Sequence, residues 1–520
     1  MFDELSSVKK LNELAKKPVD LTQDVLFSPK RIKDMVIDFL GFKFFYAAQR
    51  VNDDVIKLLF NLSQETNAIE KMKDMQDGKV TNCIKGFESE NRAVLHTATR
   101  DFFEERNDSP SAKEASNLAG TELKKLDGFL NRINKEDKFK NLVQIGIGGS
   151  FLGPLAMYSA LKPYSIKDRK VYFISNVDPD DSASILNSLD LSKTLFVSVS
   201  KSGTTLESLT NEEIVRLKLK EKGLTPKDHI VSVTGKKSPM DDPLKYLESF
   251  YIWDYVGGRY SSTSMVGGVA LSFAFGIDVF KEFLHGASQM DKLALKNDIS
   301  NISLFSALLG IWNRNFLGLC DLAVIPYSQA LSYFPLHLQQ LDMESNGKSV
   351  NKSGVKVTYK TGPAIFGDIG TNAQHSFYQL LHQGTDIIPI EMIGFKYSQY
   401  NQDLKVQQTT SQEKLLANLF AQSIALAKGK KDKNPNKNFS GNRSSIILLG
   451  RKLDPYSLGV LLSYYENKVA FQGFIWDINS FDQEGVQLGK KLANKFLDLF
   501  AKKQVDFDLG KIYLDELKKF

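Results

Sequence analysis

The stretch Thr194–Glu207, TLFVSVSKSGTTLE, predicts both the fold and a first candidate site. Its first half is a β-branched and aromatic run that is typical of a buried strand. The strand ends at a loop rich in hydroxyls, and a helical pattern begins at Leu206. The first N–H groups of a helix have no intrahelical partner, and the helix dipole favours negative charge there. We therefore expect this loop to bind an anion such as a phosphate.

The residues of this loop offer three features that an anion site uses: an accessible backbone, a positive charge and hydroxyl donors. Gly203 allows a close approach of the backbone, and Lys201 supplies positive charge. The hydroxyl-bearing residues of the loop are Ser200, Ser202, Thr204 and Thr205. A helix cap followed by a solvated loop would need only one hydroxyl, so this composition favours a phosphate site.

Strands and helices alternate on both sides of this stretch. Further strands are predicted at 142–147, 170–177 and 230–234, with helices at 151–161, 180–189 and 264–284. A second alternating block has strands at 322–326, 386–393 and 445–449 and helices at 304–316, 330–343, 372–382, 412–427 and 456–466. Strands separated by helices indicate a parallel sheet covered on both faces. The predicted fold class is α/β, with two doubly wound, flavodoxin-like parallel sheets in tandem.

The pattern suggests four parts along the chain. They are a helical N-terminal segment 1–115, a first sheet domain 116–285, a second sheet domain 286–500 and a C-terminal helical arm 501–520. In the N-terminal segment, 31–45 and 53–60 carry apolar residues at helical spacing. His96 lies among apolar neighbours in NRAVLHTATR, and we expect it to have a structural role.

Bulk composition excludes several classes of protein. The 520 residues are 42% hydrophobic and 25% charged, and the net charge of +6 is small for this length. Because no basic stripe alternates with aromatics, we expect no nucleic-acid partner. No run approaches the roughly 20 apolar residues that span a bilayer, and the N-terminus lacks a secretory pattern. With its two cysteines far apart in sequence, the chain is expected to be cytoplasmic.

A glycine-rich run, Gly146–Gly153, invites comparison with dinucleotide-binding loops. Phe151 occupies the place of the third glycine of that fingerprint, and no acidic residue clearly ends the next strand. We therefore expect no nicotinamide cofactor. Gly149 and Ser150 instead form a small turn whose N–H groups and hydroxyl suit a compact polar ligand.

Two further motifs leave alternatives open. In GGRYSST, Arg259 follows two glycines and is either an exposed turn residue or a cation for an anionic intermediate. In QQLDMESNGK, Glu344 lies near the end of a helix that stops at Asn-Gly. It is either a surface carboxylate or a catalytic base.

Histidine and lysine spacing gives weaker signals. His375 is predicted in the first turn of a helix capped by Thr371 or Asn372. His382 shares its face but lies about 10.5 Å away along the axis, which is too far for one metal ion. No His-x-His or Cys-x-x-Cys pair occurs, so no metal is expected. Lys490, in SFDQEGVQLGK, is on spacing alone ordinary solvated charge.

Six motifs occur in order between Gly146 and Lys490: GIGGSFLGP, SKSGTT, GGRYS, QLDMESNGK, GTNAQHSFYQLLHQG and SFDQEGVQLGK. Together they resemble the bacterial-type glucose-6-phosphate isomerase (phosphoglucose isomerase) family, which is built from two sugar-isomerase domains. The resemblance implies reversible isomerisation of glucose 6-phosphate and fructose 6-phosphate, in glycolysis and gluconeogenesis. The reaction would proceed by ring opening and a cis-enediol, with no cofactor and no metal.

The resemblance also implies two sets of site residues. The catalytic set is Glu344 as the base, Arg259 for the enediolate charge, and His375 for ring opening with Lys490 beside it. The substrate-binding set is Gly149, Ser150, Ser200, Lys201, Ser202, Gly203, Thr204, Thr205, Gln340 and Gln483. In the family the active site forms at a homodimer interface, and the counterpart of His375 comes from the partner subunit.

Two other functions remain to be weighed. A phosphosugar-sensing regulator on the same fold would keep the Ser200–Thr205 loop but could dispense with Glu344 and His375. Amide-transfer isomerisation would need a glutaminase domain with an N-terminal cysteine nucleophile, which the N-terminal stretch does not show. The presence of both Glu344 and His375 favours the enzyme.

Overall fold

The chain forms two compact units, Met1–Ser480 and Phe481–Phe520. The structure, a computed structural model, describes residues 2–520. Both sheets lie in the first unit, and the division into four domains remains a prediction. No helix within residues 2–520 has the length and apolar content that crossing a bilayer requires.

The first sheet has five parallel strands in the order β6-β5-β7-β8-β9. Their bounds are β5 (Asn141–Ile145), β6 (Lys170–Ile174), β7 (Thr194–Ser200), β8 (Ile230–Thr234) and β9 (Ser249–Tyr251). Numbered along the chain this is the flavodoxin-like order 2-1-3-4-5, as predicted. The order reverses between β5 and β7, and β7 is buried along its whole length. This switch point is where ligands bind in such sheets.

Helices alternate with these strands, with one correction to the prediction. Their bounds are α5 (Pro110–Glu136), α6 (Leu152–Ala160), α7 (Pro179–Ser188), α8 (Leu206–Glu221) and α9 (Met265–Phe275). The single helix predicted at 264–284 is wrong, because α9 ends before Gly276 and α10 (Ile277–Leu293) begins after it. Gly276 has φ +92°, a left-handed backbone that interrupts the helix.

The second sheet repeats the same order with a hairpin added. Strands β10 (Asp321–Pro326), β11 (Ala364–Phe366), β12 (Ile390–Tyr397) and β15 (Ser445–Lys452) are parallel, in the order β11-β10-β12-β15. Its switch point therefore lies between β10 and β12. Strand β2 (Phe42–Phe45) pairs antiparallel with β15, and β1 (Val36–Phe39) pairs with β2.

This hairpin overturns the prediction of a helix over 31–45. Only α2 (Pro29–Asp34) is helical there. Leu40 and Gly41 have φ +39° and +84° and form the tight turn that joins the strands. Phe42 and Phe44 are buried, whereas their neighbours Lys43 and Phe45 are less buried. Burial of every second residue is the period of a strand and not of a helix.

Three predicted helices of the second block are interrupted. The first is α11 (Ile302–Ile311) followed by a π-helical turn, η8 (Trp312–Phe316). The second is α12 (Phe334–Gln339) followed by a π-helical turn, η10 (Gln340–Glu344). The third is divided into α13 (Gly370–Gln374) and α14 (Tyr378–Gln383).

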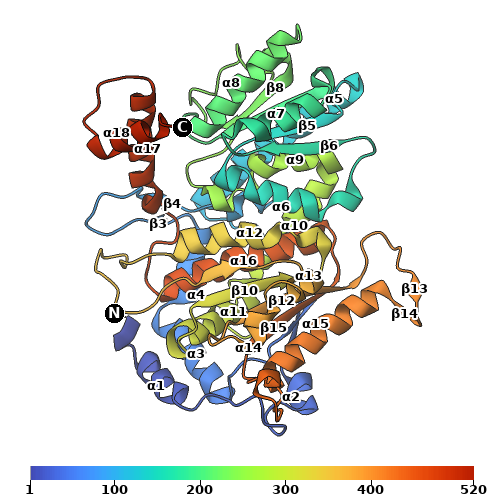
Figure 1. Cartoon of the computed structure of the whole chain (residues 1–520), viewed down its shortest axis with the longest axis vertical. Coiled ribbons are helices and arrows are strands. Elements are labelled where there is room, and N and C mark those ends of the chain that lie inside the picture. The colour runs from blue at the N-terminus through green and yellow to red at the C-terminus, as the bar shows by residue number, and fades with distance from the viewer. Residues whose placement is uncertain (1) are drawn as a thin grey trace. The chain divides into compact units, whose positions relative to one another are not determined.

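A buried helix, α16 (Pro455–Ile475), packs against α10 and α11 in the core. In Figure 1, α10, α12 and α16 lie between the two sheets. Arg100 connects α10 to α16, because its guanidinium donates to Asp291 at 2.6 Å and to Glu466 at 2.5 Å. Each charge in this buried cluster therefore has a partner of opposite sign.

The remaining elements of the first unit surround this core. They are α1 (Ser6–Ala15), α3 (Asp53–Glu65), α4 (Ala68–Gln76), β3 (Val80–Asn82), β4 (Arg92–Ala93), β13 (Lys405–Val406), β14 (Thr409–Thr410) and α15 (Ser411–Lys428). The helix predicted at 53–60 is confirmed by α3. The second unit contains α17 (Gln487–Phe500) and α18 (Asp508–Leu517), joined by edge-to-face contact of Phe496 with Phe507 at 5.0 Å.

Candidate active site

The predicted phosphate loop is a compact turn built around one hydroxyl. Strand β7 carries Ser200 to the carboxyl edge of the first sheet, and α8 begins at Leu206. Ser200 Oγ lies 2.8 Å from Thr205 Oγ1. The same oxygen accepts the backbone N–H of Gly203 at 3.1 Å and of Thr205 at 3.4 Å. Ser200 therefore fixes the shape of the loop, as a preorganised anion site requires.

The outer side of the loop is exposed. Ser202 and Thr204 are both exposed, and their hydroxyl oxygens lie 2.9 Å apart. Gly203 has φ +68°, and a Cβ there would lie 2.9 Å from Ser238 Oγ. Glycine is thus needed both for the backbone angle and for the space, while its predicted role in anion binding stays a prediction.

Lys201 ties this loop to the segment that precedes Arg259. Its Nζ donates to the carbonyl of Val256 at 3.0 Å and to that of Asp254 at 3.3 Å. Burial, and next the charge of Arg92, lower the pKa of Lys201. The two carbonyl bonds fix the Lys201 amine against the Asp254–Val256 segment.

Gly149 brings three segments together at the switch point. It lies in a short turn, η3 (Gly148–Ser150), after β5, and a Cβ at Gly149 would lie 2.2 Å from the backbone of Gly258. A Cβ at Gly148 would lie 3.1 Å from Gln340 Nε2. Only residues without side chains allow η3, the Gly258 turn and η10 to approach this closely.

Arg259 is buried and faces Glu344. The residue is 1% exposed, and its Nη1 donates to Glu344 Oε2 at 3.1 Å. Its Nε donates to Ser345 Oγ at 2.7 Å, and its Nη2 donates to the Ser480 carbonyl at 2.7 Å. The alternative of an exposed turn arginine is therefore wrong, and a fixed cation stands beside a carboxylate.

Glu344 lies on the π-helical turn η10, a feature common at functional sites. Its side chain is 25% exposed, and its Oε2 also accepts from Gln340 Nε2 at 3.2 Å. Gln340 Oε1 is buried and has no hydrogen-bond partner among the described residues. A buried acceptor without a donor fits the hydroxyl of a ligand. We call Gly149, the Ser200–Thr205 loop, Arg259, Gln340 and Glu344 the first-sheet site.

Comparisons with known proteins identify the family of the chain. A family model described as phosphoglucose isomerase matches residues 45–510. The chain belongs to the phosphoglucose isomerase family. It is 54% identical to glucose-6-phosphate isomerase of Protochlamydia amoebophila, over 100% of this chain and 98% of the relative. It is 52% identical to that of Chlamydia pneumoniae, over 96% of this chain and 94% of the relative.

A solved structure agrees over nearly the whole length. The crystal structure of a glucose-6-phosphate isomerase from Chlamydia trachomatis has a TM-score of 0.96 and 48% identity to this chain. The match covers 99% of each chain. The predicted family and fold class are therefore confirmed.

His375 is not in the first turn of a helix, so that prediction is wrong. Helix α13 begins at Gly370 with no side-chain cap and ends at Gln374, so His375 follows its C-terminal end. Gly370 packs directly on Tyr327, since a Cβ there would lie 2.4 Å from the ring. His375 is exposed. No contact described for residues 2–520 joins it to the first-sheet site.

Gln483 and Lys490 belong to the second unit of the phosphoglucose isomerase chain. Gln483 precedes a short turn, Glu484–Val486, and Lys490 is exposed near the start of α17. Their proposed roles remain predictions.

Several supporting residues were not predicted from the sequence. Ser345 Oγ lies 3.1 Å from Tyr260 Oη in addition to its bond with Arg259. The Tyr260 ring stacks on His96 with centroids 4.6 Å apart. His96 is buried as expected for a structural histidine, and burial lowers its pKa to about 3. Ser345 follows Glu344 in the quoted motif, but a lone serine gives no signal of its role.

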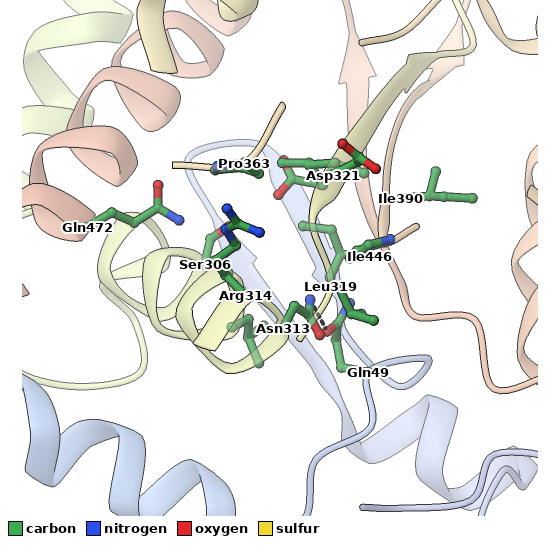
Figure 2. Close-up of a pocket in the computed structure, with 15 residues that line it drawn as sticks. Gln49, Ser306, Asn313, Arg314, Leu319, Asp321, Pro363, Ile390, Ile446 and Gln472 are labelled. Atoms are coloured by element: carbon green, nitrogen blue, oxygen red, sulfur yellow. Dashed lines mark hydrogen bonds between the residues drawn. The ribbon is translucent and has the colours of Figure 1, made fainter. Parts of the chain in front are cut away.

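A cavity at the amino-terminal edge of the second sheet is too small for a sugar phosphate. Its volume is about 30 Å³, which suits only one or two water molecules. Figure 2 shows Asn313 and Gln49 at this cavity, joined by a hydrogen bond of 3.2 Å. Buried acceptors of Asn313, Glu391 and Gln472, which line it, have no partner among the described residues. We interpret it as a hydration site.

Proposed function

We propose that the first-sheet site interconverts glucose 6-phosphate and fructose 6-phosphate, the activity of the phosphoglucose isomerase family. The observation that carries the proposal is the buried Arg259 in contact with a partly exposed Glu344. Both are linked to the phosphate loop, because Lys201 bonds the segment that leads to Arg259. In this proposal the anion loop lies at the carboxyl edge of the first sheet, and Glu344 contacts the fixed cation Arg259 from η10.

Aldose–ketose exchange needs one base and stabilisation of an oxyanion. In our proposal Glu344 removes the proton from C2 of the open-chain aldose. The C2–H electron pair forms the C1–C2 double bond, and the carbonyl π electrons move to O1. Glu344 then returns the proton to C1 while the O2 proton passes to O1, which gives the ketose.

Arg259 suits the charge movement of this reaction. Its guanidinium donates to Glu344 Oε2 at 3.1 Å. When Glu344 takes the proton, negative charge moves to the enediolate and stays near the same cation. A preorganised charge of this kind costs no reorganisation during the reaction.

The phosphate does not react in this scheme. Its binding to the Ser200–Thr205 loop, with Gly149 and Ser150, holds C1 and C2 against Glu344. A sugar without phosphate should therefore lose turnover as well as affinity.

We further propose that the active enzyme is a homodimer. His375 is exposed and separate from the first-sheet site in the contacts of its own chain. In a dimer it would open the sugar ring in the partner's site, with Lys490 and Gln483 also contacting substrate. A cytoplasmic, reducing environment suits Cys83 and Cys320, which are both free thiols.

The proposed activity is tested by a coupled assay that converts fructose 6-phosphate to glucose 6-phosphate with a chelator present. We expect full turnover with chelator and little with fructose alone. Purified protein that leaves both hexose phosphates unchanged would refute the assignment. The sensing-regulator alternative has no support in the relatives reported above, which are named isomerases.

The shared site is tested by mixing two inactive variants, Glu344→Gln and His375→Ala, and allowing subunits to exchange. If His375 acts in the partner's site, a mixed dimer has one intact site, and about a quarter of wild-type activity returns at equal mixing. If His375 acts within its own chain, no intact site forms and activity stays absent.

A further inference from the structure

The second sheet has a pocket at the position equivalent to the first-sheet site. Both sheets have the strand order 2-1-3-4 along their parallel strands, so the second switch point lies between β10 and β12. A pocket of about 520 Å³ opens there. Tyr327 and Ser328, directly after β10, and Tyr397, the last residue of β12, line it. We call this the second-sheet pocket, and its volume is typical of small-ligand sites.

The lining of the second-sheet pocket is polar and nearly uncharged. Tyr333, Tyr397 and Tyr400 line it and are 40%, 46% and 64% exposed. Hydroxyls and carboxamides supply most of the other polar groups. Lys162 is the one charged side chain, and among the described residues no carboxylate lines the pocket. Aromatic faces with hydroxyl and amide groups suit a neutral polyhydroxyl compound better than a dianion.

The walls of the pocket are held in place by side-chain hydrogen bonds. Gln399 Nε2 donates to the carbonyl of Ala160 at 2.8 Å and to that of Leu453 at 3.1 Å. Gln412 Nε2 donates to the carbonyl of Phe395 at 2.6 Å. The end of α6, the end of β12 and the segment after β15 are thereby joined. A pocket with fixed walls loses less entropy when it binds a ligand.

Tyr327 connects this pocket to His375. It is 1% exposed, and its Oη accepts from Gln374 Nε2 at 3.0 Å and lies 3.1 Å from Tyr378 Oη. Its ring also contacts Gly370, the first residue of α13. His375 follows Gln374 directly. Tyr327, which lines the pocket and is otherwise buried, thus lies between the pocket and the short helix that precedes His375.

We propose that the second-sheet pocket binds a neutral polyhydroxyl compound of hexose size and that its occupancy modulates the isomerase through Tyr327 and α13. Binding itself does not depend on the proposed catalytic roles. The modulation rests on the proposed role of His375. Two separate measurements therefore test the two parts.

Binding is tested on the full chain by ligand-observed NMR with D-glucitol as the probe. The first-sheet site is kept filled by an excess of the equilibrium mixture of hexose phosphates. Tyr400→Ala removes an exposed ring of the pocket, and Tyr513→Ala, at a residue 72% exposed on α18, is the matched control. We expect Tyr400→Ala to weaken glucitol binding about fivefold and Tyr513→Ala to leave it unchanged. Binding that does not saturate, or equal binding in all three proteins, would overturn the proposal.

Modulation is tested by measuring kcat and KM for glucose 6-phosphate with and without glucitol. We expect saturating glucitol to change kcat at least about twofold in all three proteins, with half of the change reached at an about fivefold higher glucitol concentration in Tyr400→Ala than in wild type or Tyr513→Ala. Unchanged kcat despite saturable binding would refute the connection through Tyr327. If the chain had no isomerase activity, the proposed function would fail, but the NMR result would still show whether the second-sheet pocket binds glucitol.

Discussion

The carboxyl edges of the two sheets share a topology but differ in how closely their loops approach. At the first edge, Gly149 lets backbone segments meet, and Arg259 and Glu344 are in direct contact. At the second edge, tyrosine rings and glutamine side chains surround an open pocket. The strand order thus determines where a ligand can bind, and the loop residues determine which ligand binds.

The largest effect that would distinguish the two edges is expected from Glu344→Gln. The amide keeps the shape of the side chain but cannot take a proton, so turnover should fall about a thousandfold while fructose 6-phosphate still binds. Steady-state kinetics and equilibrium binding measure both quantities. Glu213→Gln, at an exposed glutamate of α8, is the control. Near-normal turnover of Glu344→Gln would remove the first edge from catalysis.

Close packing at the first edge is tested by Gly149→Ala. The added Cβ would overlap the backbone of Gly258 and displace Arg259. Because small displacements of catalytic groups are costly, we expect kcat/KM to fall about a hundredfold. Gly128→Ala is the control, since a Cβ there has nothing within 4 Å. Full activity in Gly149→Ala would show that the close approach is not required.

The stability of the first edge should depend on pH, because the buried His96 ring stacks on Tyr260, the residue next to Arg259. The pKa of His96 is about 3 in the folded chain and about 6.5 when unfolded, so its stabilising contribution is complete above 6.5 and declines as pH falls toward 3. At pH 5 the loss is about 2 kcal/mol.

His96→Phe keeps a ring on Tyr260 and removes this titration. The difference in unfolding free energy between pH 7 and pH 5, measured by urea denaturation, should therefore shrink by about 2 kcal/mol. His337, whose pKa burial lowers to about 4, remains in both proteins and cancels in the comparison. If the difference in unfolding free energy between pH 7 and pH 5 were the same in wild type and His96→Phe, His96 would not be the group that causes the loss.

The smallest effects are expected from Ser345→Ala and Tyr260→Phe, and the Ser345 variant comes first. It removes the hydroxyl that accepts from Arg259 Nε and leaves a buried N–H without this partner. We expect kcat/KM to fall about tenfold. Tyr260→Phe, which removes the neutral contact with Ser345 and leaves the Arg259 bond in place, should cost less than about threefold. Equal effects of the two variants would argue against a role of Ser345 in positioning Arg259.

Most of the fold could be predicted because parallel strands leave a local signal. Strand Thr194–Ser200 and the phosphate loop are continuous in sequence, and the predicted strand at 230–234 is found without change. The β1–β2 hairpin could not be predicted in this way. Its place depends on pairing with β15, about 400 residues away in the chain, which no local period reveals.

The candidate site was predicted only in part. Motifs identified Arg259 and Glu344, but the serines that hold Arg259, Ser345 and Ser480, depend on packing between distant segments. The start of α13 depends on the contact of Gly370 with Tyr327, and local capping rules therefore misplaced His375. Lys490 and Gln483 remain assigned by resemblance.

The π-helical turn at Gln340–Glu344 has an evolutionary consequence. Such a turn is equivalent to an α-helix with one residue inserted. Loss of a single residue there would replace the bulge by a regular helical turn, and the 3.1 Å contact of Glu344 with Arg259 would no longer have the backbone that now supports it. A one-codon deletion in this segment should thus abolish turnover while leaving a chain that still folds.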